Sequence, residues 1–177
     1  MPVAAVFGSA RIVEGEAEYA VAYRMGALLA EAGWTIMTGG YAGAMEAASR
    51  GAGEAGGHVV GVTVSAWTGR NSANRWVIDE RPAPDLVARL GELMSADAAI
   101  AVGGGIGTLA EVALAWNLRQ KDARDAGPLI LVGAPWARIV PHLASTLIID
   151  DADVDIVRLA ADPEAAIAHL PRPSSLG

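Results

Sequence analysis

Three glycine-rich turns hold most of the residue types that could do chemistry in this sequence. They lie at residues 8–9, 39–45 and 103–108, each directly after an apolar run typical of a buried strand. Glycine permits positive φ and a close backbone approach, so that consecutive N–H groups can converge on one anion. The candidate binding residues are Gly8, Ser9, Gly39, Gly40, Gly43, Met45, Gly103, Gly104, Gly105, Gly107 and Thr108.

The turn at residues 103–108 is the strongest candidate for a phosphate site. A helix that begins near Gly107-Thr108 would add its unpaired N–H groups and its dipole, and the Thr108 hydroxyl can donate a further bond. An anion therefore fits without any lysine. For any single turn, glycines that serve only tight packing are the alternative interpretation. The occurrence of three such turns on one sheet edge makes that alternative weaker.

Glu111 lies four residues after Gly107, about one helical turn further along the chain. A carboxylate there would lie near a bound ribose phosphate. Its alternative role is to stabilise the helix, because the run from Thr108 to Glu111 also fits a capping box. Glu46 leaves a similar choice open: it could orient ribose hydroxyls or face the first turn of its own helix.

The surrounding pattern predicts the elements that must position these turns. Apolar runs typical of buried parallel strands occupy residues 3–7, 35–38, 58–64, 98–102, 129–132 and 147–149. Helical spacing occupies residues 16–32, 42–55, 84–96, 109–119 and 136–144. Strands that alternate with helices of this length predict a Rossmann-like α/β fold, a doubly wound parallel sheet in three α/β/α layers. Ligands of such a sheet bind outside the carboxyl ends of the strands, where the three turns would meet.

Residues 65–81 interrupt this alternation and are too long for an ordinary βα connection. Long loops in compact domains are usually functional or disordered, and two tryptophans and three arginines favour an ordered loop. The alternative is a loop whose tryptophans, Trp67 and Trp76, simply cover the edge of the core.

The composition excludes several classes of function. The net charge of −7 argues against an extended nucleic-acid partner. The absence of cysteine excludes a thiol nucleophile and a cysteine-built zinc site. Lys121, the only lysine, lies at a polar helix end, so neither a pyridoxal-phosphate enzyme nor a Walker A loop is supported.

The overall sequence predicts one domain at residues 1–170 and a flexible tail at residues 171–177. No apolar run reaches the roughly 20 residues that cross a bilayer, and the first residues lack a basic signal region. We therefore expect a soluble cytoplasmic protein with no membrane partner. His58, His142 and His169 have no second ligand at metal spacing, and neither a metal nor a cofactor is expected.

The second and third turns resemble the two signature motifs of the Lonely Guy family. The residues that carry the resemblance are Gly39-Gly40-Tyr41-Ala42-Gly43-Ala44-Met45 and Gly104-Gly105-Ile106-Gly107-Thr108-Leu109-Ala110-Glu111. The resemblance covers about residues 3–145. It implies a Rossmann-fold homodimer, or a higher homo-oligomer, that hydrolyses the N-glycosidic bond of cytokinin nucleoside 5′-monophosphates to free base and ribose 5-phosphate.

The resemblance also implies roles for particular residues. The motif glutamate falls on Glu111 and the phosphate-binding turn on residues 104–108, while Arg89 is the nearest match to an arginine that the family carries before the fourth strand. Arg89 would hold phosphate or ribose through its planar guanidinium. From spacing alone, Arg89 could equally be an exposed helix residue that pairs with Glu92 or Asp85.

Two departures from the family pattern keep a second function open. Gly103 stands where the family usually has proline, and the Met-His-x-Arg-Lys stretch is absent. With glycine at position 103, the turn resembles that of a sister branch, the molybdenum-cofactor carrier proteins. These proteins bind an anionic pterin without established hydrolysis. The alternatives are therefore a hydrolase with Glu111 at the reacting sugar, a carrier of a phosphorylated ligand such as molybdenum cofactor or a nucleotide, and an oligomeric scaffold with a vestigial pocket.

The apolar helix at residues 112–118 leaves one further choice open. It could face the core or a dimer partner. The resemblance implies a dimer with Trp116 near the shared surface.

Overall fold

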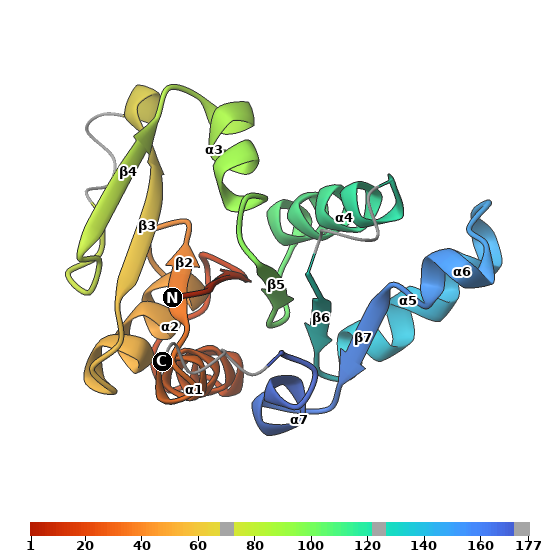
Figure 1. Ribbon diagram of the computed structural model, residues 1–177, viewed down its shortest axis with the longest axis horizontal. Helices are drawn as coiled ribbons and strands as arrows, with labels where there is room; N and C mark the ends of the chain where they lie inside the picture. Colours follow the sequence, from red (N-terminus) through yellow and green to blue (C-terminus); the bar gives the residue numbers. More distant parts are fainter. Residues whose placement is uncertain (68–72, 122–126, 172–177) are drawn as a thin grey trace.

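The computed structural model describes residues 1–67, 73–121 and 127–171. They form a parallel sheet of seven strands in the order β4-β3-β2-β1-β5-β6-β7 (Figure 1). The strands are β1 (Val3–Phe7), β2 (Thr35–Thr38), β3 (Val59–Val64), β4 (Asp79–Ala83), β5 (Ala98–Ala101), β6 (Leu129–Val132) and β7 (Val157–Ala160). The helices are α1 (Ala17–Glu31), α2 (Ala44–Glu54), the 3₁₀ turn η1 (Ser65–Trp67), α3 (Leu86–Leu93), α4 (Ile106–Lys121), α5 (Ala134–Thr146), α6 (Asp151–Val154) and α7 (Pro163–Ile167).

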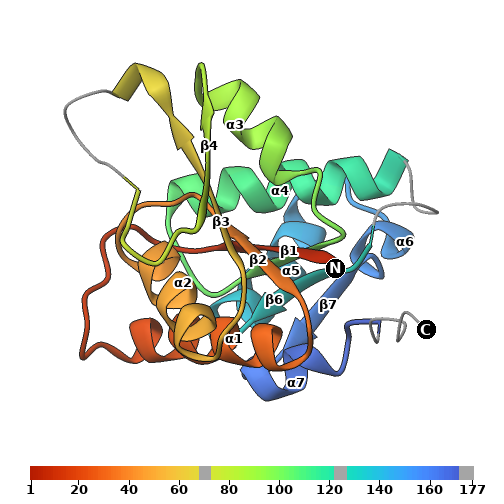
Figure 2. The same cartoon turned by 60° about the vertical axis from the view of Figure 1, so that its left-hand side comes forward.

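Helices cover both faces of the sheet, which explains why the residues of its central strands are nearly all buried and mostly apolar. Alternate residues of a strand point to opposite faces. Ala4 and Val6 of β1 therefore join the core under α1, α2 and α7, whereas Ala5 and Phe7 join the core under α3, α4 and α5. Figures 1 and 2 show these two helical layers with the sheet between them. The predicted three-layer α/β fold is confirmed.

The strand order reverses at β1, and this places the glycine turns together. From β1 the chain builds outward through β2, β3 and β4, then returns to form β5 on the other side of β1. Phe7 at the end of β1 pairs with Ala101 at the end of β5. The turns that follow these two strands thus leave the sheet side by side, at the switch point where α/β folds bind ligands.

Both edge strands differ from the sequence prediction. β4 begins in the last residues of the segment that was predicted to be a long loop and extends two residues past it, and its sequence, Asp-Glu-Arg-Pro-Ala, has no hydrophobic pattern. An edge strand can carry charges and a proline because one side of it has no strand to pair with. The other edge strand is β7, and the strand predicted at residues 147–149 is wrong. Those residues follow α5, and Ile148 is fully exposed there.

The five longer helices lie where helical spacing predicted them, with ends that shift by a few residues. Gly33 and Gly56, which follow the ends of α1 and α2, adopt φ values of 79° and 76°. Such values favour glycine and are typical of helix C-terminal ends. The predicted tail lies outside the described residues, except for Pro171.

Helices α1 and α2 pack with almost no side chain between their backbones at two points. A Cβ at Gly26 would overlap the carbonyl oxygen of Ala48, and a Cβ at Gly51 would overlap that of Tyr23. This close approach fixes α2, and with it the glycine turn from which α2 begins.

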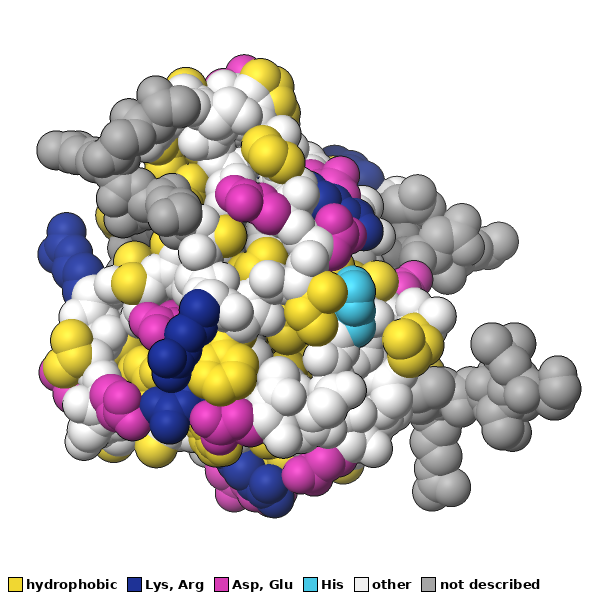
Figure 3. Space-filling view, turned by 90° about the vertical axis from the view of Figure 1, so that its left-hand side faces the viewer, with side chains coloured by type: hydrophobic (Ala, Val, Ile, Leu, Met, Phe, Trp, Pro, Cys, Tyr) yellow, Lys and Arg dark blue, Asp and Glu magenta, His cyan; other side chains and the backbone are white. Residues whose placement is uncertain are grey.

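In the described part of the chain, no helix is both long and apolar enough to cross a membrane. On the face shown in Figure 3, arginine and acidic side chains lie together in mixed clusters. Ion pairs of this kind join Arg81 to Asp79 and Glu92, and Arg50 to Glu14 and Glu54.

Candidate functional site

The first glycine turn is wedged between the other two. A Cβ at Gly8 would overlap the Cβ of Ala44, and the backbone N–H of Ala44 donates to the carbonyl of Ser9 at 2.8 Å. Gly43 has a φ of 70°, and a Cβ there would overlap the backbone of Ser9. On the other side, the N–H of Val102 donates to Phe7 at 2.9 Å. The structure therefore brings together the turns that sequence reasoning placed on one edge.

The turn at residues 103–108 presents its backbone to solvent. Gly103 and Gly104 adopt φ values of 80° and 131°, and Gly104, Gly105 and Gly107 are exposed. α4 begins at Ile106, and the first N–H groups of a helix have no partner within it. This geometry suits an anion. Thr108 is only 3% exposed and packs beneath Gly104, so its hydroxyl contact with phosphate stays a prediction.

Arg89 reaches from α3 across the sheet edge and is 6% exposed. Its Nε donates to the carbonyl of Val62 at 2.8 Å, and its Nη2 lies 3.7 Å from the sulfur of Met45. The guanidinium carbon lies 5.8 Å from the ring centroid of Tyr41. A Cβ at Gly39 would overlap Nη2, so the second glycine turn leaves the space that this guanidinium occupies.

The alternative of an exposed Arg89 that pairs on its own helix is wrong. Asp85 instead caps α3, accepting from the N–H of Ala88 at 2.8 Å, and Glu92 accepts from Arg81 at 2.8 Å. Arg89 faces Glu111, with 3.7 Å between Nη1 and Oε1. Burial lowers the pKa of Arg89, and the charge of Glu111 opposes that shift.

Glu111 is a largely buried acid beside the buried guanidinium cation of Arg89. Its side chain is 13% exposed, and burial raises its pKa to about 7, against the opposing attraction of Arg89. The capping-box alternative is wrong, since α4 begins at Ile106 and Thr108 is its third residue rather than its cap. Glu46 lies in the first turn of α2, as one of its two interpretations expected.

The Glu111 carboxyl group, with the Arg89 cation beside it, is suited to proton transfer. A separation of 3.7 Å is too long for a direct hydrogen bond. Near neutral pH the carboxyl group is present in both its protonated and ionised forms, the condition in which an acid or base catalyst works best. It lies on α4 about one turn beyond the glycine turn.

Sequence reasoning missed the residues that hold this site in place. Tyr41 is buried, and its hydroxyl accepts from the N–H of Val64 at 2.8 Å. Asn74 donates from its side-chain nitrogen to the carbonyls of Gly40 and Tyr41, both at 3.1 Å. The unusual length of the segment at residues 65–81 was the signal for such a role, but nothing in its pattern singled out Asn74.

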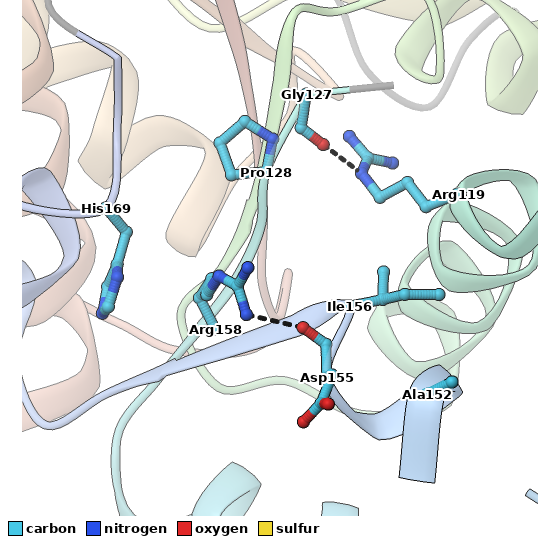
Figure 4. Close-up of a pocket in the computed structure, with 8 residues that line it drawn as sticks. All are labelled: Arg119, Gly127, Pro128, Ala152, Asp155, Ile156, Arg158 and His169. Atoms are coloured by element: carbon cyan, nitrogen blue, oxygen red, sulfur yellow. Dashed lines mark hydrogen bonds between the residues drawn. The ribbon is translucent and has the colours of Figure 1, made fainter. Parts of the chain in front are cut away.

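A separate pocket of about 440 Å³ lies at the other end of the strands, near the amino ends of β6 and β7 (Figure 4). Arg119 there donates to Gly127 at 2.6 Å, and Arg158 donates to the carbonyl of Asp155. These contacts tie α4 to the start of β6 and brace the start of β7. The glycine turns lie at the carboxyl ends, so this pocket is not part of the candidate site. Its lining residues are Arg119, Gly127, Pro128, Ala152, Asp155, Ile156, Arg158 and His169.

The fold and the turns at its switch point define a Rossmann-like α/β protein. Within that class, the chain belongs to the SLOG cluster4 family, which matches residues 1–122. Every candidate site residue lies inside this range. An uncharacterized protein of Archaeoglobus fulgidus is 36% identical over 120 residues, which are 67% of this chain and 77% of that protein.

Two solved structures are similar along nearly the whole chain. The molybdenum cofactor binding protein of Rippkaea orientalis has a TM-score of 0.76 and 28% identity, covering 94% of this chain and 93% of that one. The molybdenum cofactor carrier protein of Chlamydomonas reinhardtii has a TM-score of 0.74 and 31% identity, covering 94% of both chains.

Proposed function

We propose that this protein is a nucleoside 5′-monophosphate phosphoribohydrolase. Its ligand would place a phosphate on the turn at residues 103–108 and its ribose near Glu111. The observation that carries the proposal is the buried Glu111–Arg89 pair, one helical turn beyond that exposed turn. The resemblance of residues 39–45 and 104–111 to the Lonely Guy motifs supports the same substrate class, with a purine of the cytokinin type.

The reaction breaks the bond between C1′ of the ribose and a ring nitrogen of the base. The electron pair of that bond goes to the base, and positive charge develops on the sugar. Water adds its oxygen to C1′, and its two protons end on the new hydroxyl and on the released base. Ionised Glu111 would stabilise the positive charge or accept the proton of water, whereas the protonated form could deliver a proton to the base.

Arg89 has two roles in this proposal. The resemblance gives it a contact with phosphate or ribose, and its burial against Val62 and Met45 favours a positioning role toward Glu111. A buried arginine stays charged, so it favours the ionised state of the acid beside it.

The proposal is tested by mixing the protein with AMP or isopentenyladenosine 5′-monophosphate and measuring free base by chromatography. We expect release by the wild type and a loss of roughly 10²- to 10⁴-fold in Glu111→Gln. Glu92→Gln is the matched control, since Glu92 pairs with Arg81. Tight binding without release by the wild type would contradict hydrolysis.

The second candidate is a carrier that binds a phosphorylated ligand such as molybdenum cofactor and cleaves nothing. It is supported by the likeness to the two cofactor-binding structures over at least 93% of each chain, and by Gly103. The protein would be mixed with molybdenum cofactor, gel-filtered and assayed for bound molybdenum. Retention by the wild type and loss in Gly105→Glu would support the carrier. If neither AMP nor this cofactor raised the thermal midpoint, the scaffold alternative would remain.

We also propose that the protein acts as a homodimer, as the resemblance implies. Of the helix at residues 112–118, Val112 and Ala115 face the core, and the ring N–H of Trp116 donates to Asp153 at 2.7 Å. Two leucines of α4, Leu109 and Leu118, are 37% and 41% exposed, and their spacing of nine residues places them on opposite flanks of the helix. A second copy would cover the flank of α4 that carries Leu118.

A further inference from the structure

An unbroken line of contacts runs from Glu111 to an exposed tryptophan. Arg89 lies 3.7 Å from Glu111 and 5.8 Å from the ring centroid of Tyr41. The ring of Tyr41 in turn lies 5.8 Å from that of Trp67, at an interplanar angle of 32°. Tyr41 is 7% exposed and Trp67 is 44% exposed. The inner part of this line is therefore buried, and its outer end faces solvent.

Trp67 lies on the edge of the sheet where the ligand is expected. It ends η1, which directly follows the carboxyl end of β3. The glycine turns follow the same ends of the neighbouring strands β2, β1 and β5. Trp67 can therefore face the ligand that these turns hold.

The support behind Trp67 is rigid. Val64 donates to the hydroxyl of Tyr41, and Asn74 holds the carbonyls of Gly40 and Tyr41. Trp76 shows what a packing role looks like in the same segment: it lies against Gly53 of α2, and its ring nitrogen is buried. Trp67, by contrast, is exposed and lies beside the buried ring of Tyr41.

We propose that Trp67 is the stacking platform for the planar nitrogen heterocycle of the ligand whose phosphate lies on the turn at residues 103–108. Every purine, like a pterin, offers a π-face to such a ring. This inference rests on the proposed function only in that the ligand carries both a phosphate and a heterocycle. It holds for a hydrolase and for a carrier.

The test compares a ligand that has the heterocycle with one that lacks it. Wild type and Trp67→Leu are titrated calorimetrically with AMP and with ribose 5-phosphate. Loss of one stacked base weakens binding by about 5- to 150-fold. We expect that loss for AMP in Trp67→Leu and no more than about a twofold change for ribose 5-phosphate. Ile78→Ala is the control, because Ile78 is exposed and its backbone N–H donates to Val59 at the amino end of β3, the end away from the glycine turns.

A second measurement does not depend on the leucine variant. AMP should quench the tryptophan fluorescence of the wild type, and Trp67→Phe should bind AMP with most of that quenching lost. If Trp67→Leu lost the same affinity for AMP and for ribose 5-phosphate, or bound AMP as tightly as the wild type does, the stacking role alone would be overturned. A wild type that bound neither ligand would overturn the proposed function along with it.

Discussion

Glu111 keeps its carboxyl group where charge is disfavoured, and this has a cost that depends on pH. Below pH 4.5 the group is protonated in both the folded and the unfolded chain. Between 4.5 and about 7 only the unfolded chain ionises, so the free energy of unfolding falls as the pH rises. Above that range the cost is complete.

Glu111→Gln should therefore stabilise the protein at about pH 8, since glutamine mimics the protonated acid. We expect a gain in unfolding free energy of about 1–3 kcal/mol, which shrinks as the pH falls toward 4.5. Urea unfolding at several pH values measures it. A gain that stayed constant with pH would show that the carboxyl group is not the source.

Gly39 matters because Arg89 occupies the space where a side chain would be. Gly39→Ala should displace the guanidinium, and we expect AMP affinity or base release to fall at least about tenfold, since misplaced catalytic groups cost this much or more. Its cost in stability should be about 1–3 kcal/mol, the range for overpacking. Gly91→Ala on α3 is the control, because a Cβ at Gly91 meets nothing within 4 Å. Unchanged binding by Gly39→Ala would contradict the positioning role of Arg89.

The elements show which parts of the fold the sequence specifies locally. Buried strands such as β1 and β6 are predictable because sheets with two covered faces need continuous apolar runs. β4 was missed because pairing with β3 on one side, and not hydrophobic burial, holds its polar residues in the sheet. Residues 147–149 have the apolar character of a strand, yet they form the turn that follows α5. Local pattern cannot reveal which segment completes an edge.

The same limit applies to the candidate site. The glycine turns and Glu111 can be identified from residue type and spacing. The contact of Arg89 with Val62 and Tyr41 depends instead on how β3, α2 and α3 are placed in space. The role of Asn74 could not be predicted for the same reason, because its contacts with Gly40 and Tyr41 exist only in the folded chain.

The close approach of α1 and α2 predicts a strong effect from a small substitution. Gly26→Ala would force its Cβ against the backbone of Ala48, which cannot move aside as a side chain can. We expect a loss of about 1–3 kcal/mol in unfolding free energy, even though alanine favours helices. Ala20→Val, at an exposed position of α1, should cost less than about 1 kcal/mol. Thermal denaturation of the two variants gives the comparison, and equal midpoints would contradict it.

In the whole molecule, all the candidate residues come from the first two thirds of the chain, the part that the family matches. β6, β7 and their helices complete the sheet beside β5, on the side away from β3 and β4, against which α3 with Arg89 packs. The flank of α4 that carries Leu118 is the surface where the dimer proposal can be tested.

Leu118→Glu should convert a dimer into a monomer, because a charge at a covered apolar contact has no partner. Light scattering after gel filtration measures the mass, and the free energy of unfolding of the separated chain should change little since Leu118 is 41% exposed. Arg138→Glu, on α5, tests for a general effect of added charge. A wild type that ran as a monomer would contradict the dimer.

Because Glu111 lies close to the exposed turn, ligand binding should also be coupled to proton binding. A phosphate that arrives beside a carboxyl group with a pKa of about 7 raises that pKa further, so the complex takes up a proton from the buffer. Affinity should then decline as the pH rises through 7. In calorimetry, the measured heat should vary with the ionisation enthalpy of the buffer, which gives the number of protons bound with each ligand.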